Sequence, residues 1–332
     1  MTTICDASND PAAWTSKEIG GKEGLVRRFS AEELAALDEV IAANRNRAAD
    51  TITRAGFDHP VVNAMMAEVR KTLLKGRGAV ILAGADVARL GLEDYKRLYW
   101  GLGTHLGNGA VQSYRRDKIG YVQKEEENPT GRGYLMDIEL SSHTDFHELL
   151  SLAAVTKAQS GGESGIVSSL ALHERIRATR PELLPPLYEG YYHESGGIVS
   201  EEKVPIFGCV DGKVSCYYHR GFMVNAAKQR GEAMPEALEE AMRYLSEMAG
   251  DPDLRADFML EPGEMLFWHN FTALHSRTAF TDAPGAKRLL LRLWLNVPDG
   301  RPLPASFHDR ARYMDRVHET GEAAIDYARK RA

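Results

Sequence analysis

Four residues of this sequence have types and an order suited to binding a metal ion together with an acidic ligand. His143-Thr144-Asp145 supplies a histidine and a carboxylate, His275 follows later in the chain, and Arg288 comes 13 residues after His275. Two imidazoles and one carboxylate can hold one face of an octahedral Fe(II) and leave three positions open for a co-substrate and O2. An arginine beyond the second histidine can clamp the far carboxylate of a bidentate acid bound to that iron. The pattern therefore predicts an oxygenase site.

The His-x-Asp motif is a weak signal by itself. The chain has 11 His and 47 acidic residues in 332 positions. At that composition about 1.6 His-x-Asp/Glu pairs are expected by chance, and one occurs, at His143. A solvated pair in the polar loop 141–145 would explain the motif equally well, so further evidence has to come from the C-terminal half.

The stretch from Arg288 to Leu295 has the alternation of a strand with one apolar face. Because successive side chains of a strand point to opposite sides, the odd-numbered leucines of 289–295 share one face, and Arg288, Leu290, Arg292 and Trp294 share the other. A face made only of leucines is expected to pack outward under covering elements, which turns the two arginines inward. Buried arginines are costly without anions, so either internal salt bridges, with an acid such as Glu264, or acidic small molecules should meet them.

Spacing separates the roles of the two arginines. Four residues along a strand place their Cα atoms about 13 Å apart, too far for both to hold one carboxylate. We therefore expect Arg288 and Arg292 to serve two ligands or two ends of one site. Nearby, we expect His147 to contact substrate or handle a proton, with simple hydrogen bonding as the alternative, and Tyr134 to line the mouth of the site. Trp268, His269 and Asn270 are candidates to support the metal ligands, and for Trp268 we expect structural packing instead.

The surrounding sequence predicts strands with helices gathered toward the N-terminus and in one insertion. Ser30-Ala31-Glu32-Glu33 is a capping box, and residues 1–29 read as an irregular arm. We expect helices over 30–44, 59–74 (closed by Gly76), 92–102, 172–179, 235–248 and from about 310 onward. We expect strands over 78–82, 151–159, 165–170, 265–268 and 288–295, and two short strands within 200–225 with a turn at Asp211-Gly212. Residues 107–136 are polar and charged, and a lid or a surface loop fits them equally well.

This pattern indicates a mainly β (α+β) fold, a jelly-roll barrel buttressed by helices. We expect one domain over 1–332, with an arm and helices at 1–75, the jelly-roll core with a helical insertion at 76–302, and a helical tail at 303–332. A net charge of −6 argues against nucleic-acid and membrane-surface partners, which leaves a small-molecule substrate and an undetermined oligomeric state. Three widely spaced cysteines suggest neither a disulfide framework nor a zinc signature, so we expect buried or idle thiols. No signal pattern is present, so we expect a cytoplasmic location.

The motifs together resemble the taurine dioxygenase-like family of Fe(II)/2-oxoglutarate oxygenases (TauD/TfdA and clavaminate synthase-like), from about Gly76 to Pro302. The best-matched blocks are Arg132-Gly133-Tyr134 leading into 139–145, then 160–164, 262–264, 270–277 and 288–295. The resemblance implies a double-stranded β-helix with the metal inside one mouth of the barrel. It also implies Fe(II) as cofactor, with 2-oxoglutarate and O2 as co-substrates.

The family pattern assigns roles to individual positions of this chain. It implies that His143, Asp145 and His275 are the catalytic iron ligands. Ser164 stands where the family usually has a threonine whose hydroxyl bonds a 2-oxoglutarate carboxylate, and Arg288 would pair with the distal carboxylate. Arg292 stands where some members bind an anionic group of the prime substrate. Related halogenases lack the carboxylate that Asp145 supplies, so a halogenase is not expected.

Three functions remain open from the sequence. The first is an Fe(II)/2-oxoglutarate-dependent dioxygenase acting on a small, anionic or amino-acid-derived metabolite, with hydroxylation as the default and desaturation, cyclisation or demethylation as other outcomes. The second is a zinc hydrolase that uses His143, His147 and His275, although it makes poor use of Asp145 and leaves the arginine pair unexplained. The third is a catalytically idle metal-binding barrel. The identity of the metal separates the first two.

Overall fold

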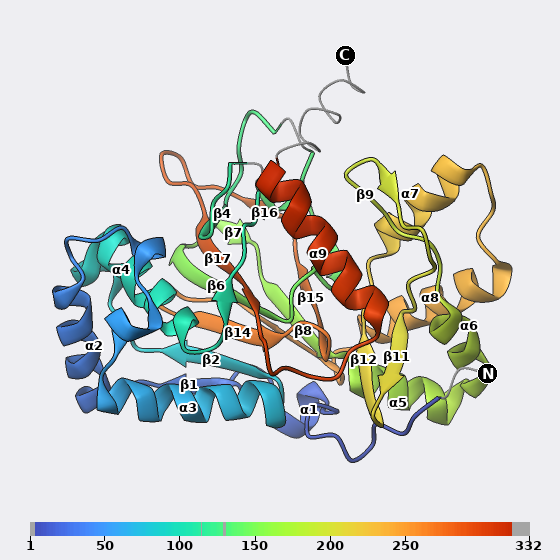
Figure 1. Cartoon of the computed structure of the whole chain (residues 1–332), viewed down its shortest axis with the longest axis horizontal. Coiled ribbons are helices and arrows are strands. Elements are labelled where there is room, and N and C mark those ends of the chain that lie inside the picture. Colours follow the sequence, from blue (N-terminus) through green and yellow to red (C-terminus); the bar gives the residue numbers. More distant parts are fainter. Residues whose placement is uncertain (1–3, 114, 129–130, 321–332) are drawn as a thin grey trace.

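The fold is built on two facing β-sheets, shown by the computed structural model in Figure 1. The structure describes residues 4–113, 115–128 and 131–320. The larger sheet has the strand order β1-β2-β14-β6-β17-β3, with β4 also paired to β17. Its strands are β1 (Val26–Arg28), β2 (Ala79–Ala83), β3 (Asn108–Gly109), β4 (Gly120–Val122), β6 (Leu149–Thr156), β14 (Met265–His269) and β17 (Leu289–Asn296).

The smaller sheet has the order β13-β8-β15-β5 and carries most of the site. Its strands are β5 (Leu140–His143), β8 (Ser164–Ser168), β13 (Arg255–Phe258) and β15 (Ala273–Arg277). Three short pairs complete the β structure: β7 (Ser160–Gly161) with β16 (Phe280–Thr281), β9 (Glu194–Ser195) with β10 (Ile198–Val199), and β11 (Phe207–Val210) with β12 (Lys213–Cys216).

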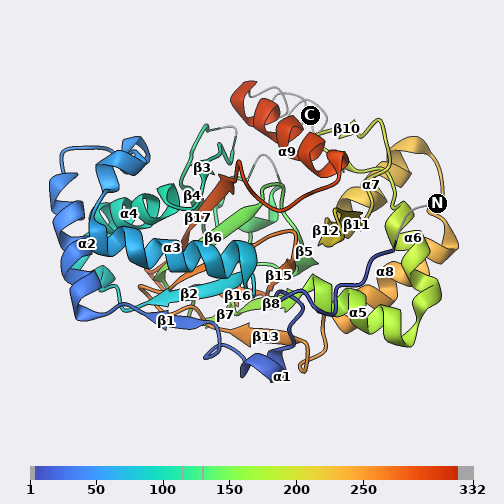
Figure 2. The same ribbon diagram turned by 60° about the horizontal axis from the view of Figure 1, so that its bottom comes forward.

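Helices cover the outer faces of both sheets. On the larger sheet lie α2 (Ala31–Ala43), α3 (Pro60–Lys75) and α4 (Val87–Thr104). Figure 2 shows α3 running across the strands of this sheet. The other group of helices lies beside the smaller sheet: α5 (Ser169–Thr179), α6 (Leu184–Glu189), α7 (Arg220–Arg230) and α8 (Glu236–Met248). In Figure 1, α9 (Ala305–Thr320) crosses in front of the sheets.

Three hydrophobic clusters correspond to these layers. Leu291, Leu293 and Leu295 of β17 are buried in the cluster under α2–α4. Leu290 and Trp294, on the opposite face of β17, are buried in the cluster between the two sheets. The predicted alternation of this strand is therefore confirmed, and it turns Arg288 and Arg292 toward the interior of the barrel. The two facing sheets, with buried side chains packed between them, have the arrangement of the predicted jelly roll.

Most predicted helices and strands are confirmed, with boundary shifts that have local causes. The capping box at Ser30 and Glu33 forms and opens α2, and Gly76 ends α3. The strand expected over 165–170 instead ends at Ser168, because the Ser168 side chain accepts from the Ala171 amide and caps α5. The region 107–136 contains β3, β4 and the short 3₁₀ helix Gly133–Leu135, apart from residues 114 and 129–130, which lie outside the described residues.

The expectation of a wholly irregular arm over residues 1–29 was wrong. It contains α1 (Ser16–Ile19) and β1, which pairs in parallel with β2. Three residues are too few to show strand periodicity, so only the partner strand defines β1. Helix α7 was not predicted either. The tail beyond residue 320 lies outside the described part of the chain.

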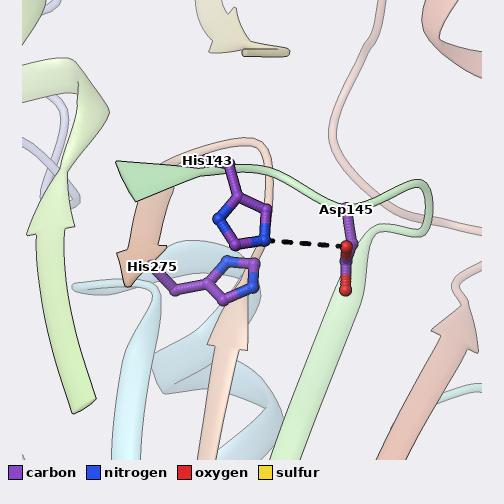
Figure 3. A group of neighbouring side chains, drawn as sticks. All are labelled: His143, Asp145 and His275. Atoms are coloured by element: carbon purple, nitrogen blue, oxygen red, sulfur yellow. Dashed lines mark ion pairs between the residues drawn. The ribbon is translucent and has the colours of Figure 1, made fainter. Parts of the chain in front are cut away.

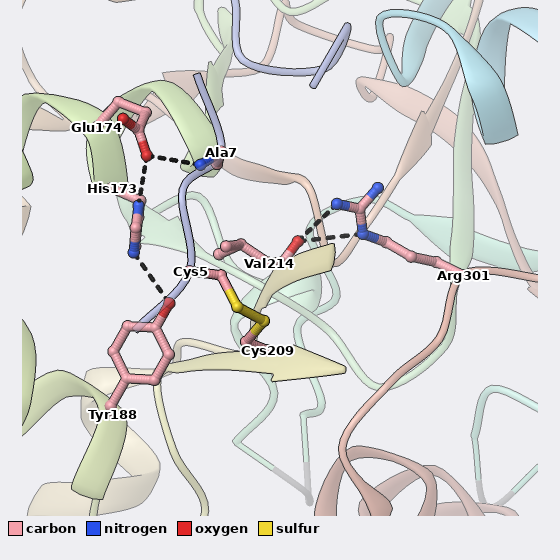
Figure 4. The surroundings of a disulfide bond; sticks show 8 residues. All are labelled: Cys5, Ala7, His173, Glu174, Tyr188, Cys209, Val214 and Arg301. Carbon is pink, nitrogen blue, oxygen red and sulfur yellow. Dashed lines mark hydrogen bonds and ion pairs between the residues drawn. A yellow bond between two sulfur atoms is a disulfide. The ribbon is translucent and has the colours of Figure 1, made fainter. Parts of the chain in front are cut away.

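The expectation of buried or idle thiols was wrong for two of the three cysteines. Cys5 of the arm is joined to Cys209 of β11 by a disulfide, 204 residues apart in the sequence (Figure 4), and Cys216 is free and buried. Linear spacing does not reveal such long-range proximity. Disulfides are rare in a reducing cytoplasm, so the cytoplasmic location stays a prediction. Among the described residues, every helix is too short or too polar to cross a membrane.

Residues of the N-terminal arm form hydrogen bonds with elements from distant parts of the sequence. Arg301 donates to Asp10 at 2.8 Å, and the Trp14 indole donates to the Arg77 carbonyl at 2.7 Å. Glu174 accepts from the Ala7 amide at 2.8 Å, close to the disulfide in Figure 4.

Candidate metal and co-substrate site

The two histidines of the predicted triad form one cross-strand pair. His143 ends β5, and the register places it directly opposite His275 of β15, so both side chains project from the same face of the smaller sheet. Their ring centroids are 4.2 Å apart. Asp145 lies two residues beyond β5, with its Oδ1 3.9 Å from Nε2 of His143 (Figure 3).

The three side chains form a compact donor set. One ligand atom from each lies within 4.8 Å of the other two, and Figure 3 shows them turned toward one another. Burial, and then the neighbouring His143, lower the pKa of His275 to about 3, so its imidazole is neutral, the form that ligates metals. Burial opposes ionisation of Asp145, yet His275, Arg292 and His143 hold its pKa well below its ordinary value. Two imidazoles and one carboxylate fit Fe(II).

Hydrogen bonds from neighbouring strands orient these donors. Nδ1 of His143 lies 2.7 Å from the Ser141 carbonyl, which leaves Nε2 for a metal. The Trp294 indole donates to Oδ2 of Asp145 at 3.0 Å. Asn270 accepts from the Asp145 amide and donates to the Asp145 carbonyl, both at 3.0 Å. Asp145 is therefore held at both its backbone and its carboxylate.

Of the three residues predicted to support the ligands, Asn270 does so directly. His269 instead lies 3.0 Å from a carboxylate oxygen of Glu148. Trp268 packs against His275 with ring centroids 4.9 Å apart, and its buried indole N–H has no hydrogen-bond partner in the described part of the chain.

The triad opens into a cavity of about 350 Å³. Five arginines line the cavity: Arg132, Arg220, Arg277, Arg288 and Arg292. The acidic side chains of the lining are Glu139 and Asp145. The cavity is therefore strongly cationic before any metal binds, and it suits anionic ligands.

Arg288 and Ser164 are both buried, and both line the cavity. Its Nη2 donates to the Gly162 carbonyl at 3.3 Å, and its Nη1 is buried without a hydrogen-bond partner in the part of the chain that the structure describes. Burial, and then the nearby Arg277, lower the pKa of Arg288 to about 10. A buried guanidinium with an unpaired N–H, in the same cavity as a buried serine hydroxyl, fits the distal carboxylate of a dicarboxylate.

Arg292 lies closer to the metal ligands than Arg288 does. Its Nε donates to Gln112 at 2.8 Å, and its Nη1 lies 3.9 Å from Oδ2 of Asp145. Its guanidinium stacks on the rings of Tyr134 and Trp294, each 4.4 Å away. Tyr134 lines the cavity as predicted.

The internal acid considered for Arg292 has another partner. Glu264 pairs with Lys22 at 2.7 Å. Nη2 of Arg292 is buried and has no hydrogen-bond partner among the described residues, so it is available to a ligand.

The structure places His147 outside this cavity, in the simple hydrogen bonding that was the alternative to a substrate contact. The His147 side chain is buried, with Nδ1 2.8 Å from Oδ1 of Asn296 and Nε2 3.4 Å from Asp315. It lines a separate cavity on the far side of Trp294. The local chain leads from β5 into β6 rather than forming a helix, so residues 143 and 147 do not share a face. The zinc-hydrolase hypothesis loses one of its three histidines.

Arg277 and His219 are cavity residues that were not predicted to be functional. Arg277 is the last residue of β15, two residues after His275, and this spacing along a strand is the one sequence signal that both side chains share a face. His219 lies just before α7. Its ring centroid is 5.3 Å from that of His143 and 3.7 Å from that of Phe222, on which it stacks. Burial, and then His143, lower the pKa of His219 to about 3. The sequence around His219 carries no motif that would have placed it here.

Comparisons with known proteins agree with this geometry. FR-33289 synthase from Streptomyces rubellomurinus is 28% identical over 81% of this chain and 87% of its own length. Uridine-5'-phosphate dioxygenase from Streptomyces sp is 32% identical over 44% of this chain and 56% of its own length. The structure of asparagine oxygenase with Fe(II), hydroxyasparagine and succinate has a TM-score of 0.67, with 14% identity over 82% of this chain and 93% of that one.

The sequence model of the family described as "Taurine catabolism dioxygenase TauD, TfdA family" matches residues 45–294. This range contains the triad and all five cavity arginines. Members of the family depend on Fe(II), 2-oxoglutarate and O2. The chain belongs to the TauD/TfdA family of Fe(II)/2-oxoglutarate oxygenases.

Proposed function

We propose that the chain oxidises a C–H bond of a small anionic metabolite, using Fe(II) held by His143, Asp145 and His275. The observation that supports this most strongly is the donor set: three ligand atoms within 4.8 Å at one wall of a cationic cavity of about 350 Å³. Bound Fe(II), 2-oxoglutarate and O2 supply the oxidising power, with succinate and CO2 released. Hydroxylation is the default outcome, and desaturation, cyclisation or demethylation would use the same residues.

The protein's own residues position the reactants. His143, Asp145 and His275 occupy one face of the metal and leave the other face to ligands. Arg288 and Ser164 hold the distal carboxylate of 2-oxoglutarate, which fixes the direction of its chelating end. Asn270 and Trp294 keep Asp145 in place. The aromatic lining of the cavity excludes water from the reacting atoms.

The charge balance of the cavity supports an anionic prime substrate. Fe(II) with one carboxylate and the dianion of 2-oxoglutarate sums to −1, against five lining arginines and Glu139. A cationic excess remains, and Arg292 lies closest to the metal ligands with a free buried N–H. Two proteins of similar sequence or fold act on uridine-5'-phosphate and on asparagine, and both substrates carry anionic groups. A phosphate, phosphonate, sulfonate or amino-acid carboxylate would satisfy Arg292.

An anaerobic titration of metal-free protein tests the cofactor assignment. Adding Fe(II) and 2-oxoglutarate should produce a visible metal-to-ligand charge-transfer band that saturates at one iron per chain and is absent in His143→Ala. Tight zinc binding without such a band would reject the oxygenase and favour a hydrolase. A band without succinate formation for any anionic substrate offered would favour an idle barrel.

Matched arginine variants test the division of roles. Succinate release should be stimulated by some members of a panel of phosphate esters, phosphonates, sulfonates and amino acids. With such a substrate, Arg292→Leu should raise the substrate KM and leave 2-oxoglutarate affinity nearly unchanged. Arg288→Leu should do the reverse. Loss of 2-oxoglutarate binding in Arg292→Leu would show that the roles are assigned wrongly.

A further inference from the structure

Arg277 joins the cavity to the segment 133–138 that runs along its rim. Its Nη2 donates to the Met136 carbonyl at 2.7 Å and to the Ile138 carbonyl at 2.6 Å. Its Nε and Nη1 are buried without a hydrogen-bond partner among the described residues, and the side chain lines the cavity. One part of this guanidinium therefore holds backbone, while the rest has unused donors.

Arg277 itself lies near the residues proposed to hold the distal carboxylate of 2-oxoglutarate. The sheet register places Arg277 directly opposite Ser164. The guanidiniums of Arg277 and Arg288 share the Phe280 ring, at 4.9 and 5.0 Å from its centroid. Both guanidiniums are buried, and Arg277 is one cause of the lowered pKa of Arg288, so the two cations repel each other. A carboxylate received by both would remove the repulsion and satisfy free N–H groups on each.

Residues 133–138 also contact Arg292, the residue proposed to bind the prime substrate. Tyr134 belongs to this segment, and its ring stacks on the Arg292 guanidinium. Phe280, which lies against both arginines, donates its amide to the Asp137 carbonyl at 3.0 Å. A continuous set of contacts thus runs from Arg288 through Arg277 and residues 133–138 to Arg292.

Resting on the proposed function, we infer that Arg277 is a positioning residue that couples the distal carboxylate of 2-oxoglutarate to the order of residues 133–138. With the carboxylate bound, the guanidinium is held from both sides, and its grip on the Met136 and Ile138 carbonyls tightens. Tyr134 and Arg292 are then held in place for the prime substrate. Because coupling between sites is reciprocal, 2-oxoglutarate raises the affinity for that substrate.

Hydrogen exchange of residues 131–139 tests the coupling directly. Anaerobic Fe(II)-protein is compared without ligand, with saturating 2-oxoglutarate, and with saturating 2-oxopentanoate. The last compound has the same chelating end and a methyl group in place of the distal carboxylate. We expect 2-oxoglutarate to slow exchange in this segment and 2-oxopentanoate to leave it unchanged. Equal slowing by both ligands would overturn the inference, and this comparison needs no variant.

Variants locate the coupling in Arg277. Arg277→Gln should weaken 2-oxoglutarate binding about ten- to a hundredfold and abolish the slowing of exchange at saturating ligand. Arg277→Lys keeps the charge and should recover part of the affinity without the slowing, because one ammonium cannot serve both sides. Arg288→Gln is the matched control: it should also weaken binding, while the exchange of the unliganded segment stays as in the parent.

The charge-transfer band distinguishes failure of the coupling from failure of the proposed function. A band with 2-oxoglutarate in Arg277→Gln shows that the metal site has folded. If the parent shows the band but no slowing of exchange, the coupling is refuted and the proposed function stands. If the parent shows no band, the proposed function fails and the inference fails with it.

Discussion

Replacing Trp294 with phenylalanine should weaken metal binding by removing one hydrogen bond. The Trp294 indole donates to Oδ2 of Asp145 at 3.0 Å, inside a buried site. A hydrogen bond to a charged group contributes about 1.5–3 kcal/mol, and loss of an outer-layer bond to a metal ligand typically lowers metal affinity about 10- to 100-fold. The two estimates agree, so the Fe(II) Kd should rise about 10- to 100-fold in Trp294→Phe.

The chain supplies a matched control for this change. Trp268 is buried to a similar degree and packs on His275, but its indole N–H has no hydrogen-bond partner in the described residues. Trp268→Phe makes the same truncation without breaking a bond to a ligand, so its Fe(II) Kd should stay within about threefold of the parent.

Anaerobic calorimetric titration of the metal-free proteins with Fe(II) gives the three dissociation constants. Equal losses in both variants would mean that ring volume, rather than the hydrogen bond, governs metal binding. An unchanged Kd in Trp294→Phe would refute the reasoning outright.

Three further changes test the surroundings of the site. In Gly162→Ala the new Cβ would lie 2.9 Å from Nε of Arg288, at a residue with φ +81°. We expect the Kd for 2-oxoglutarate to rise about tenfold and the Kd for Fe(II) to stay unchanged, and calorimetric titration measures both constants. Burial, and then Arg54, lower the pKa of His105 to about 4 from 6.5, so between these pH values the unfolded chain binds a proton that the folded chain does not, and stability falls as the pH drops. In His105→Gln this loss of stability, about 2 kcal/mol after allowing for the partial exposure of His105, should disappear from the free energy of unfolding measured with denaturant. The same pH dependence in the variant and the parent would contradict this. Reduction of the Cys5–Cys209 disulfide, or Cys209→Ser, should lower the free energy of unfolding by about 3–5 kcal/mol, because the disulfide closes a loop of 204 residues. The same denaturation midpoint with and without reductant would argue against this stabilisation.

The sequence predicted the parts of the site whose chemistry requires particular residue types. Two histidines, a carboxylate and inward-facing arginines are readable from identity and strand alternation, and the structure brings His143, Asp145 and His275 together. The opposition of His143 and His275 was not readable, because register is set by pairing between β5 and β15.

The errors at the site share the same physical origin. His147 was considered because four-residue spacing suits a helix, but the chain there bends between β5 and β6 and places the side chain in another cavity. Arg277 and the Cys5–Cys209 pair depend on which distant segments become neighbours. Single-sequence patterns report local geometry and burial, whereas these contacts arise from tertiary packing.

The fastening of the N-terminal arm has a consequence for the order in which the molecule assembles. Asp10 is synthesised 291 residues before Arg301, its partner at 2.8 Å, and Cys5 precedes Cys209 by 204 residues. At about 5–20 residues per second, the arm waits roughly 10–60 s for these partners to emerge from the ribosome. The first-made segment is thus among the last to be placed, and a domain fused ahead of it would have to accommodate that late docking step.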